Sequence, residues 1–194
     1  MTKPYLIFNG DTDGICAAHQ YYLSFPDDYI PVTGVKRDNS LLKKVPETDA
    51  ELIVFDIAIE KNLEALTSFL TAGNKVRWFD HHVSKEIPEA DHFTPHIDTG
   101  STVNTAYLVA QYIGTYSPWT IMGLCGDNVF STAEKLVSEL KLTAADYELL
   151  KEAGELINYN GYGEITDDLH LHPADILDRM QPYTDAFAFL EETD

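Results

Sequence analysis

The sequence predicts an α/β fold: a mainly parallel sheet flanked by helices, with a helical C-terminal part. In the first half of the chain, short apolar runs alternate with segments whose apolar residues recur at helical spacing. Such alternation favours parallel strands, because a crossover helix returns the chain to the same end of the sheet. In the second half, helical patterns follow one another. We therefore expect an α/β core at residues 1–130 and a helical extension at 131–194, packed on the same lobe without a separate C-terminal substrate-binding domain.

Four segments have the character of strands. Residues 52–55 (Leu-Ile-Val-Phe) are uninterruptedly apolar, as expected for a strand buried on both faces of a parallel sheet. Residues 5–8, 29–35 and 75–79 are also short and rich in apolar or β-branched side chains. We expect these four strands to form the sheet.

Helices are expected between and after the strands. Residues 15–23 and 62–70 carry apolar positions at helical spacing, and Gly73 is placed to end the second of them. Further helical patterns cover residues 101–113, 119–124 and 147–157.

Two capping-box spacings mark helix starts in the second half, at Ser131 and, in a weaker form, at Thr143. The punctuated segment 158–163 (Asn-Tyr-Asn-Gly-Tyr-Gly) follows, and then residues 167–177 and an acidic tail.

The composition limits the function. Among 194 residues, 44% are hydrophobic, enough for a real core, and no apolar stretch approaches the ~20 residues of a membrane helix. The N-terminus does not have the pattern of a signal peptide, so we expect a cytoplasmic protein without a membrane partner. Cys16 and Cys125 lie in apolar stretches and are expected to be buried thiols. With 32 acidic against 13 basic residues and no basic run, binding to long duplex nucleic acid is disfavoured.

Acidic and imidazole side chains follow three of the predicted strands. Asp11 and Asp13 come after the first strand, Asp56 after the strand at 52–55, and Asp80-His81-His82 after the strand at 75–79. Because ligands bind at the carboxyl ends of parallel strands, these segments should meet at one edge of the sheet. A fourth segment, Gly126-Asp127-Asn128, follows an apolar helix and could reach the same edge.

Such a cluster indicates metal chemistry. Carboxylates packed closely oppose one another's ionisation, and divalent cations remove that cost. Hard oxygen ligands with a minority of imidazole suit Mn²⁺ or Mg²⁺. Two metals bridged by a carboxylate can generate hydroxide and orient a phosphate, so phosphoester or phosphoanhydride hydrolysis is indicated. Taken singly, each aspartate is as readily a turn residue or a helix N-cap, and the histidine pair a solvated loop. It is their conjunction at successive strand ends that favours a site.

The chain resembles the DHH phosphoesterase superfamily, named for the triplet found here as Asp80-His81-His82. The motifs cover residues 8–128. The resemblance implies a hydrolase with two Mn²⁺ ions (Mg²⁺ is an alternative) acting on short phosphodiesters, such as oligoribonucleotides or dinucleotides, by a metal-hydroxide mechanism. It further implies that Asp11 and Asp56 bind one metal, and that the other is bound by Asp13, Asp56, His81 and Asp127. His82 would face the substrate phosphate, and Asp80 would orient the histidine pair.

The sequence departs from the family pattern in two places. The family usually carries His or Asp where this chain has Asn9, whose amide oxygen can ligate a hard cation but adds no charge, so the first metal should bind more weakly. The Gly-Gly-Gly-His motif of the family's C-terminal domain is also missing. The chain is therefore expected to be either a minimal, catalytic-lobe-only protein or a fragment.

Further candidates each allow two interpretations. Ser101 stands in a Ser/Thr-rich helix start that is either a phosphate site or an ordinary cap. Arg37, in the basic pair Lys36-Arg37, either contacts a substrate phosphate or is solvated. Tyr159 and Tyr162 either stack on a base or, as we prefer, pack in the core or a hinge.

Two other functions stay open at this point. A pyrophosphatase or exopolyphosphatase would need several basic residues around the site, and the acidic chain offers few. A catalytically silent binding module would fit Asn9 and the missing second domain, although it would have no need to keep the carboxylates and histidines together. The sequence is compatible with an oligomer.

Overall fold

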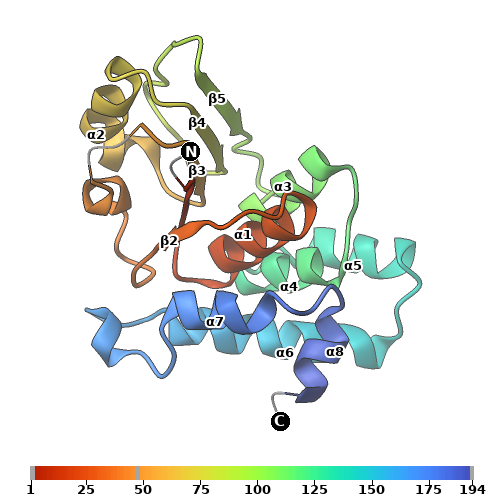
Figure 1. Ribbon diagram of the computed structural model, residues 1–194. Helices are drawn as coiled ribbons and strands as arrows, with labels where there is room; N and C mark the ends of the chain where they lie inside the picture. Colours follow the sequence, from red (N-terminus) through yellow and green to blue (C-terminus); the bar gives the residue numbers. More distant parts are fainter. Residues whose placement is uncertain (1–2, 47–48, 193–194) are drawn as a thin grey trace.

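A five-stranded parallel sheet forms the centre of the protein (Figure 1). The structure, a computed structural model, describes residues 3–46 and 49–192. The strand order is β2-β1-β3-β4-β5. The chain order reverses between β1 and β3, which is the position where open parallel sheets bind ligands. The strands are β1 (Tyr5–Phe8), β2 (Ile30–Val32), β3 (Leu52–Phe55), β4 (Val76–Asp80) and β5 (Phe93–Ile97).

Eight α-helices surround the sheet in the described part of the chain. Figure 1 shows α2 on one side of the sheet and α1, α3 and α4 on the other, with α6, α7 and α8 stacked beyond them. Two short 3-10 helices complete the fold. The bounds are α1 (Thr12–Ser24), η1 (Leu41–Lys44), α2 (Ile59–Thr71), α3 (Thr105–Ile113), α4 (Pro118–Gly126), α5 (Phe130–Glu139), α6 (Ala144–Asn160), η2 (Thr166–Asp168), α7 (Pro173–Met180) and α8 (Ala186–Glu192).

The two faces of the sheet are buried in two separate apolar clusters. Alternate side chains of a strand point to opposite faces. In β3, Ile53 and Phe55 belong to the cluster under α1, α3 and α4, whereas Leu52 and Val54 belong to the cluster under η1 and α2. This burial on both faces explains why the strand is apolar at every position.

The C-terminal helices share the first of these clusters. Leu150 and Ala153 of α6, Leu177 of α7 and Phe189 of α8 belong to the same buried group as the side chains of α1 and α4. Residues beyond 130 thus complete the core on that side of the sheet. Cys16 and Cys125 are buried free thiols, as predicted. In the described part of the chain, no helix combines the length and apolarity needed to cross a membrane.

The predicted fold class is confirmed, and several local predictions are corrected. The strand predicted at 29–35 is confined to Ile30–Val32, and β5 and α8 were not predicted. Thr143 caps α6 through a capping box with Asp146, as its spacing indicated. The spacing at Ser131 was misleading, because α5 begins one residue earlier, at Phe130, and has no side-chain cap. Gly73 has φ 86° just beyond α2, the left-handed conformation that favours glycine after a helix.

Candidate metal centre

The predicted acidic and imidazole residues gather at the carboxyl edge of the sheet. Asp11 and Asp13 follow β1, Asp56 follows β3, and these two strands are neighbours at the point of reversal. His81 directly follows β4, and Asp127 directly follows α4. Beside this edge, the backbone at Gly10 passes close to the backbone at Gly34. A Cβ atom at Gly10 would lie 1.8 Å from the Gly34 backbone oxygen, so this approach requires glycine.

His81 lies at the centre of the group. Its Nε2 is 3.3 Å from Asp56 Oδ1, 3.6 Å from Asp127 Oδ2 and 3.8 Å from Asp13 Oδ2. Among the described residues, two sets of possible ligand atoms share this histidine, and the atoms of each set lie within 4.8 Å of one another. One set is Asp13, His81 and Asp127, and the other is Asp56, His81 and His82. Four segments of the chain thus bring aspartate and histidine side chains, which commonly bind metals, close together.

Asp13 is fixed by the beginning of α3. The backbone N–H groups of Thr105 and Ala106 donate to its Oδ2 and Oδ1, at 2.8 and 2.6 Å. Exposed N–H groups at a helix N-terminus favour a negative charge. The carboxylate is fully buried and is therefore held in one orientation.

Asp56 adopts an unusual backbone conformation. Its φ is 58°, in the left-handed region that few non-glycine residues occupy and that Asp and Asn tolerate best. Its Oδ1 accepts a hydrogen bond of 3.2 Å from the hydroxyl of Thr105. Asn128, directly after Asp127, has φ 60°. Backbone strain of this kind concentrates at functional sites.

Asp80 contacts both histidines of the triplet. Its Oδ1 accepts from the backbone N–H of His81 at 2.9 Å and lies 2.5 Å from Nδ1 of His82. This contact leaves Nε2 of His82 free to meet a ligand, and the side chain is 42% exposed. These two contacts are the ones that the predicted positioning role of Asp80 requires.

The carboxylates are electrostatically suited to a bound cation. Burial and the charges of Asp56 and Asp127 raise the pKa of Asp13 well above its usual value. Burial and the charge of Asp11 likewise raise the pKa values of Asp56 and Asp127. Among the described residues, the buried oxygens Asn9 Oδ1 and Asp127 Oδ2 have no hydrogen-bond partner. The carboxylates around His81 fit a divalent metal, which would offset their repulsion and supply a partner for Asp127 Oδ2.

The Asp11 side of the cluster differs, because a lysine occupies it. Asp11 caps α1 by accepting from Gly14 N through Oδ1, and its Oδ2 is 2.8 Å from Lys36 Nζ. Burial opposes the charge of Lys36, but the carboxylates of Asp11 and Asp127 outweigh it and raise its pKa. Asn9 Nδ2 donates to the Lys36 carbonyl oxygen at 3.3 Å. Neither set of possible ligand atoms includes Asp11.

Two predicted substrate contacts are not brought to the cluster by any described interaction. Arg37 is exposed and forms no ion pair within the described residues; the neighbouring Lys36 makes the contact instead. Ser101 is exposed in a turn, and α3 begins later, at Thr105, with Asn104 as its cap. Packing of the two tyrosines in the core is wrong, since Tyr159 is 71% exposed and Tyr162 is 55% exposed, whereas their role in a hinge stays a prediction.

Sequence reasoning does not identify Thr105 and Asn158, and within the basic pair Lys36-Arg37 it favours Arg37 over Lys36. Thr105 supplies both its amide and its hydroxyl to the carboxylates. Asn158 Oδ1 accepts from Lys36 Nζ at 2.7 Å. The sequence contains the basic pair and the Asn-Gly-rich segment, but only tertiary structure brings Lys36 to Asn158 and Thr105 to Asp13 and Asp56.

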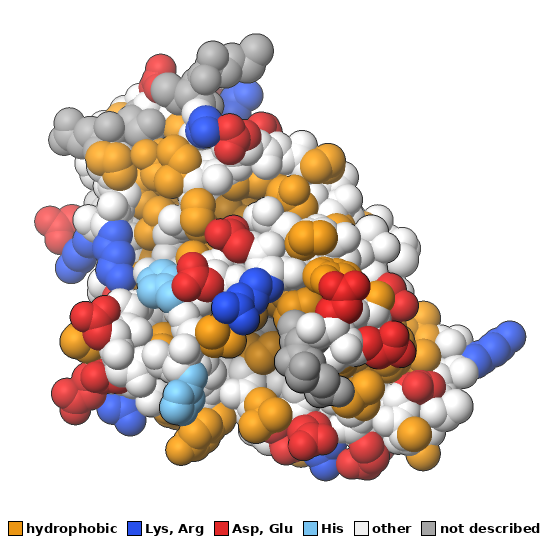
Figure 2. Space-filling view, turned by 60° about the horizontal axis from the view of Figure 1, so that its bottom comes forward, with side chains coloured by type: hydrophobic (Ala, Val, Ile, Leu, Met, Phe, Trp, Pro, Cys, Tyr) orange, Lys and Arg blue, Asp and Glu red, His pale blue; other side chains and the backbone are white. Residues whose placement is uncertain are grey.

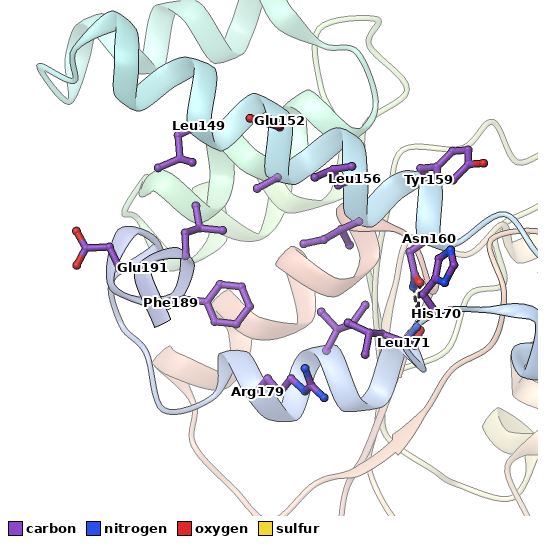
Figure 3. A pocket seen from close by; sticks show the side chains of 14 residues that line it. Leu149, Glu152, Leu156, Tyr159, Asn160, His170, Leu171, Arg179, Phe189 and Glu191 are labelled. Carbon is purple, nitrogen blue, oxygen red and sulfur yellow. Dashed lines mark hydrogen bonds between the residues drawn. The ribbon is translucent and has the colours of Figure 1, made fainter. Parts of the chain in front are cut away.

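A large apolar pocket lies away from these residues. Figure 3 shows a pocket of ≈ 720 Å³ among α6, α7 and α8, into which Leu149, Leu156 and Phe189 project. Its lining is mainly apolar and includes none of the clustered acidic residues. The candidate metal ligands therefore lie outside this pocket, at the edge of the sheet.

Comparison with known proteins identifies the family. The profile of the DHH family, N-terminal domain, matches residues 5–130. The chain therefore belongs to the DHH phosphoesterase superfamily. No curated protein matches the sequence significantly.

Two solved structures share the fold. The first is the DHH domain of a member of the s1p family of ribosomal proteins, with 14% identity and a TM-score of 0.66 over 98% of this chain. The second is the exonuclease RecJ bound to manganese, with 16% identity and a TM-score of 0.57, again over 98% of this chain. The chain spans 55% of the first structure and 60% of the second. At these identities the similarity establishes the fold.

Proposed function

We propose that the protein is a metal-dependent phosphoesterase that hydrolyses short phosphodiesters, such as oligoribonucleotides or dinucleotides. The observation that carries this proposal is the convergence of Asp13, Asp56, His81 and Asp127 on one point at the carboxyl edge of the sheet. Membership of the DHH superfamily supports it.

Asp13, Asp56, His81 and Asp127 would hold a divalent cation. Mn²⁺ suits this mixture of carboxylate oxygen and imidazole nitrogen, and the related fold of RecJ is described with manganese. A second ion beside Asn9 and Asp11 is the prediction of the family pattern. When bound, such cations neutralise charge on phosphoryl oxygens and lower the pKa of an attacking water.

The protein's own side chains would orient the phosphate and move protons. With Nδ1 of His82 held by Asp80 and the side chain 42% exposed, Nε2 would contact a phosphate oxygen or donate a proton to the leaving oxygen. Thr105 fixes Asp13 and Asp56 relative to each other, because its amide binds one and its hydroxyl the other. The ligand positions are therefore set before a substrate arrives.

The surface charge favours a short substrate. Figure 2 shows acidic side chains dispersed over the face where the C-terminal helices come forward, with basic groups in only a few places. A net charge of −19 opposes binding of a long polyanion. A phosphoanhydride substrate would concentrate more negative charge and would need more basic side chains around the site than the ion pairs show.

A substrate panel with Mn²⁺ tests the proposal. Short RNA, dinucleotides, cyclic nucleotides and pyrophosphate would be incubated with the protein, with EDTA as the metal-free control. We expect hydrolysis of the short phosphodiesters, and its loss in Asp56→Asn. The control Asp178→Asn removes an exposed aspartate of α7 and should keep full activity. Near-wild-type turnover by Asp56→Asn would refute the assignment of the centre, and selective cleavage of pyrophosphate would refute the substrate class.

A further inference from the structure

A lysine ammonium lies within the acidic cluster. Lys36 Nζ is 2.8 Å from Asp11 Oδ2, 2.7 Å from Asn158 Oδ1 and 3.7 Å from Asp127 Oδ1. The side chain is only 24% exposed. This cation therefore occupies the side of the cluster that the family pattern assigns to a metal held by Asp11.

The protein holds this lysine from both its backbone and its side chain. The Lys36 N–H donates to Gly161 O at 2.9 Å, and the Lys36 carbonyl accepts from Asn9 Nδ2. The ring of Tyr162 has its centroid 5.6 Å from Nζ, a cation–π contact. The end of α6 thus secures the lysine in place, so it is not a surface side chain that meets the site by chance.

Asp11 has both carboxylate oxygens engaged by the chain itself. Oδ1 accepts from the backbone N–H of Gly14, and Oδ2 meets the ammonium. The residue that would complete a metal site there is Asn9, whose buried oxygen is neutral. Both sets of possible ligand atoms lie instead around His81.

Asp127 connects the two halves of the cluster. Its Oδ1 is 3.7 Å from Lys36 Nζ, and its Oδ2 is 3.6 Å from His81 Nε2. The Asp127 carboxylate could therefore interact with two cations, the Lys36 ammonium through Oδ1 and a divalent ion near His81 through Oδ2. A second divalent ion on the Asp11 side would have to compete with the ammonium for the same oxygens, against the repulsion of like charges.

We propose that the ammonium of Lys36 takes the place of one divalent cation, so that the centre binds a single Mn²⁺, held around His81. This inference rests on the proposed function, which supplies the remaining metal. A mononuclear centre with its own built-in cation would stabilise phosphate charge on the Asp11 side at any metal concentration.

Mn²⁺ binding to the whole protein tests the proposal. Equilibrium dialysis with metal analysis would give the stoichiometry, and electron paramagnetic resonance would distinguish an isolated ion from a spin-coupled pair. We expect one isolated Mn²⁺ in the wild type. We expect Lys36→Met to take up two, with the signature of a coupled pair, and Lys36→Arg, which keeps the charge, to remain at one. The control Lys43→Met removes an exposed lysine that forms no ion pair in the described residues and should also remain at one.

Each outcome is decisive. Two Mn²⁺ ions in the wild type, or one in both wild type and Lys36→Met, would overturn the role of Lys36 while leaving the phosphoesterase proposal standing. Absence of Mn²⁺ binding in the wild type would refute the metal centre and the proposed function together. If Lys36→Met fails to fold, the wild type and Lys36→Arg still decide the stoichiometry.

Discussion

Asp13→Asn and Asp56→Asn make the same chemical change within one buried cluster, yet the structure predicts different effects on stability. Each substitution removes one negative charge and so relieves repulsion to a similar extent. The difference lies in hydrogen bonding. Both oxygens of Asp13 accept backbone N–H groups at the start of α3, whereas Asp56 accepts one hydroxyl, from Thr105.

The expected difference follows from these contacts. An amide at position 13 keeps one acceptor oxygen and turns a donor toward the other N–H, so one hydrogen bond to a charged group is lost. Such a bond is worth about 1.5–3 kcal/mol. An amide at position 56 keeps its acceptor for Thr105, and Asn tolerates the φ of 58° there. We expect Asp13→Asn to be less stable than Asp56→Asn by about 2 kcal/mol.

Urea denaturation in EDTA measures this difference. For a slope of roughly 2 kcal/mol per molar urea, the two midpoints should differ by about 1 M. Circular dichroism reports the unfolding, and the metal-free condition separates the hydrogen-bond effect from loss of a metal ligand. Equal midpoints, or a lower midpoint for Asp56→Asn, would refute the reasoning that the start of α3 is anchored by the Asp13 carboxylate.

Three further predictions concern other parts of the protein. Asp80→Asn should lower kcat/KM about 10–100-fold at an unchanged urea midpoint, because it weakens the hydrogen bond that orients His82; unchanged kcat/KM would contradict this role. Burial lowers the pKa of His19 from 6.5 to about 4, so the folded protein binds a proton at His19 less readily than the unfolded chain does. The free energy of unfolding should therefore fall by up to roughly 3 kcal/mol as the pH falls from about 6.5 to 4. Urea titrations across this range should show a shallower loss in His19→Gln, and identical pH dependence would exclude His19 as the source. Gly10→Ala should lower the free energy of unfolding by about 3 kcal/mol or more, because its Cβ would lie 1.8 Å from a backbone oxygen. Gly73→Ala has open space around its Cβ but a φ of 86°, so it should lower the free energy of unfolding by only about 1 kcal/mol in the same assay. The reverse order would contradict the close backbone approach at Gly10.

The fold class could be predicted because it depends on local patterns, and the misses have local reasons. Residues 52–55 signal a buried parallel strand by composition alone. β5 was missed because Pro95 interrupts its sequence, and proline is tolerated there because β5 is an edge strand. At Ser131 the spacing of a capping box is present, but the turn at Asn128, with φ 60°, starts the helix too early to use it.

The site could be predicted where its residues stand at strand ends, and not where packing brings them in. Asp13, Asp56 and His81 follow strands and converge as expected from a parallel sheet. Lys36 and Asn158 come from loops and the end of α6, and nothing in the order of residues shows that they meet. For the same reason the sequence pattern indicates the basic pair but favours Arg37, whereas in the structure Lys36 contacts the carboxylates.

The left-handed backbone of Asp56 has a consequence for how this position can change in evolution. A residue that replaces Asp56 has to meet two requirements. It has to supply a carboxylate to the centre, and its backbone has to adopt the φ of 58°. Asn and Gly satisfy the backbone but remove the carboxylate, whereas Glu keeps a carboxylate but tolerates the backbone poorly. A lineage that lost the metal chemistry would therefore be expected to pass through Asn or Gly at this position. Among descendants of this sequence, Asn or Gly at position 56 would mark a protein that has lost the metal chemistry but keeps its fold. Glu at this position would mark a protein whose fold is destabilised.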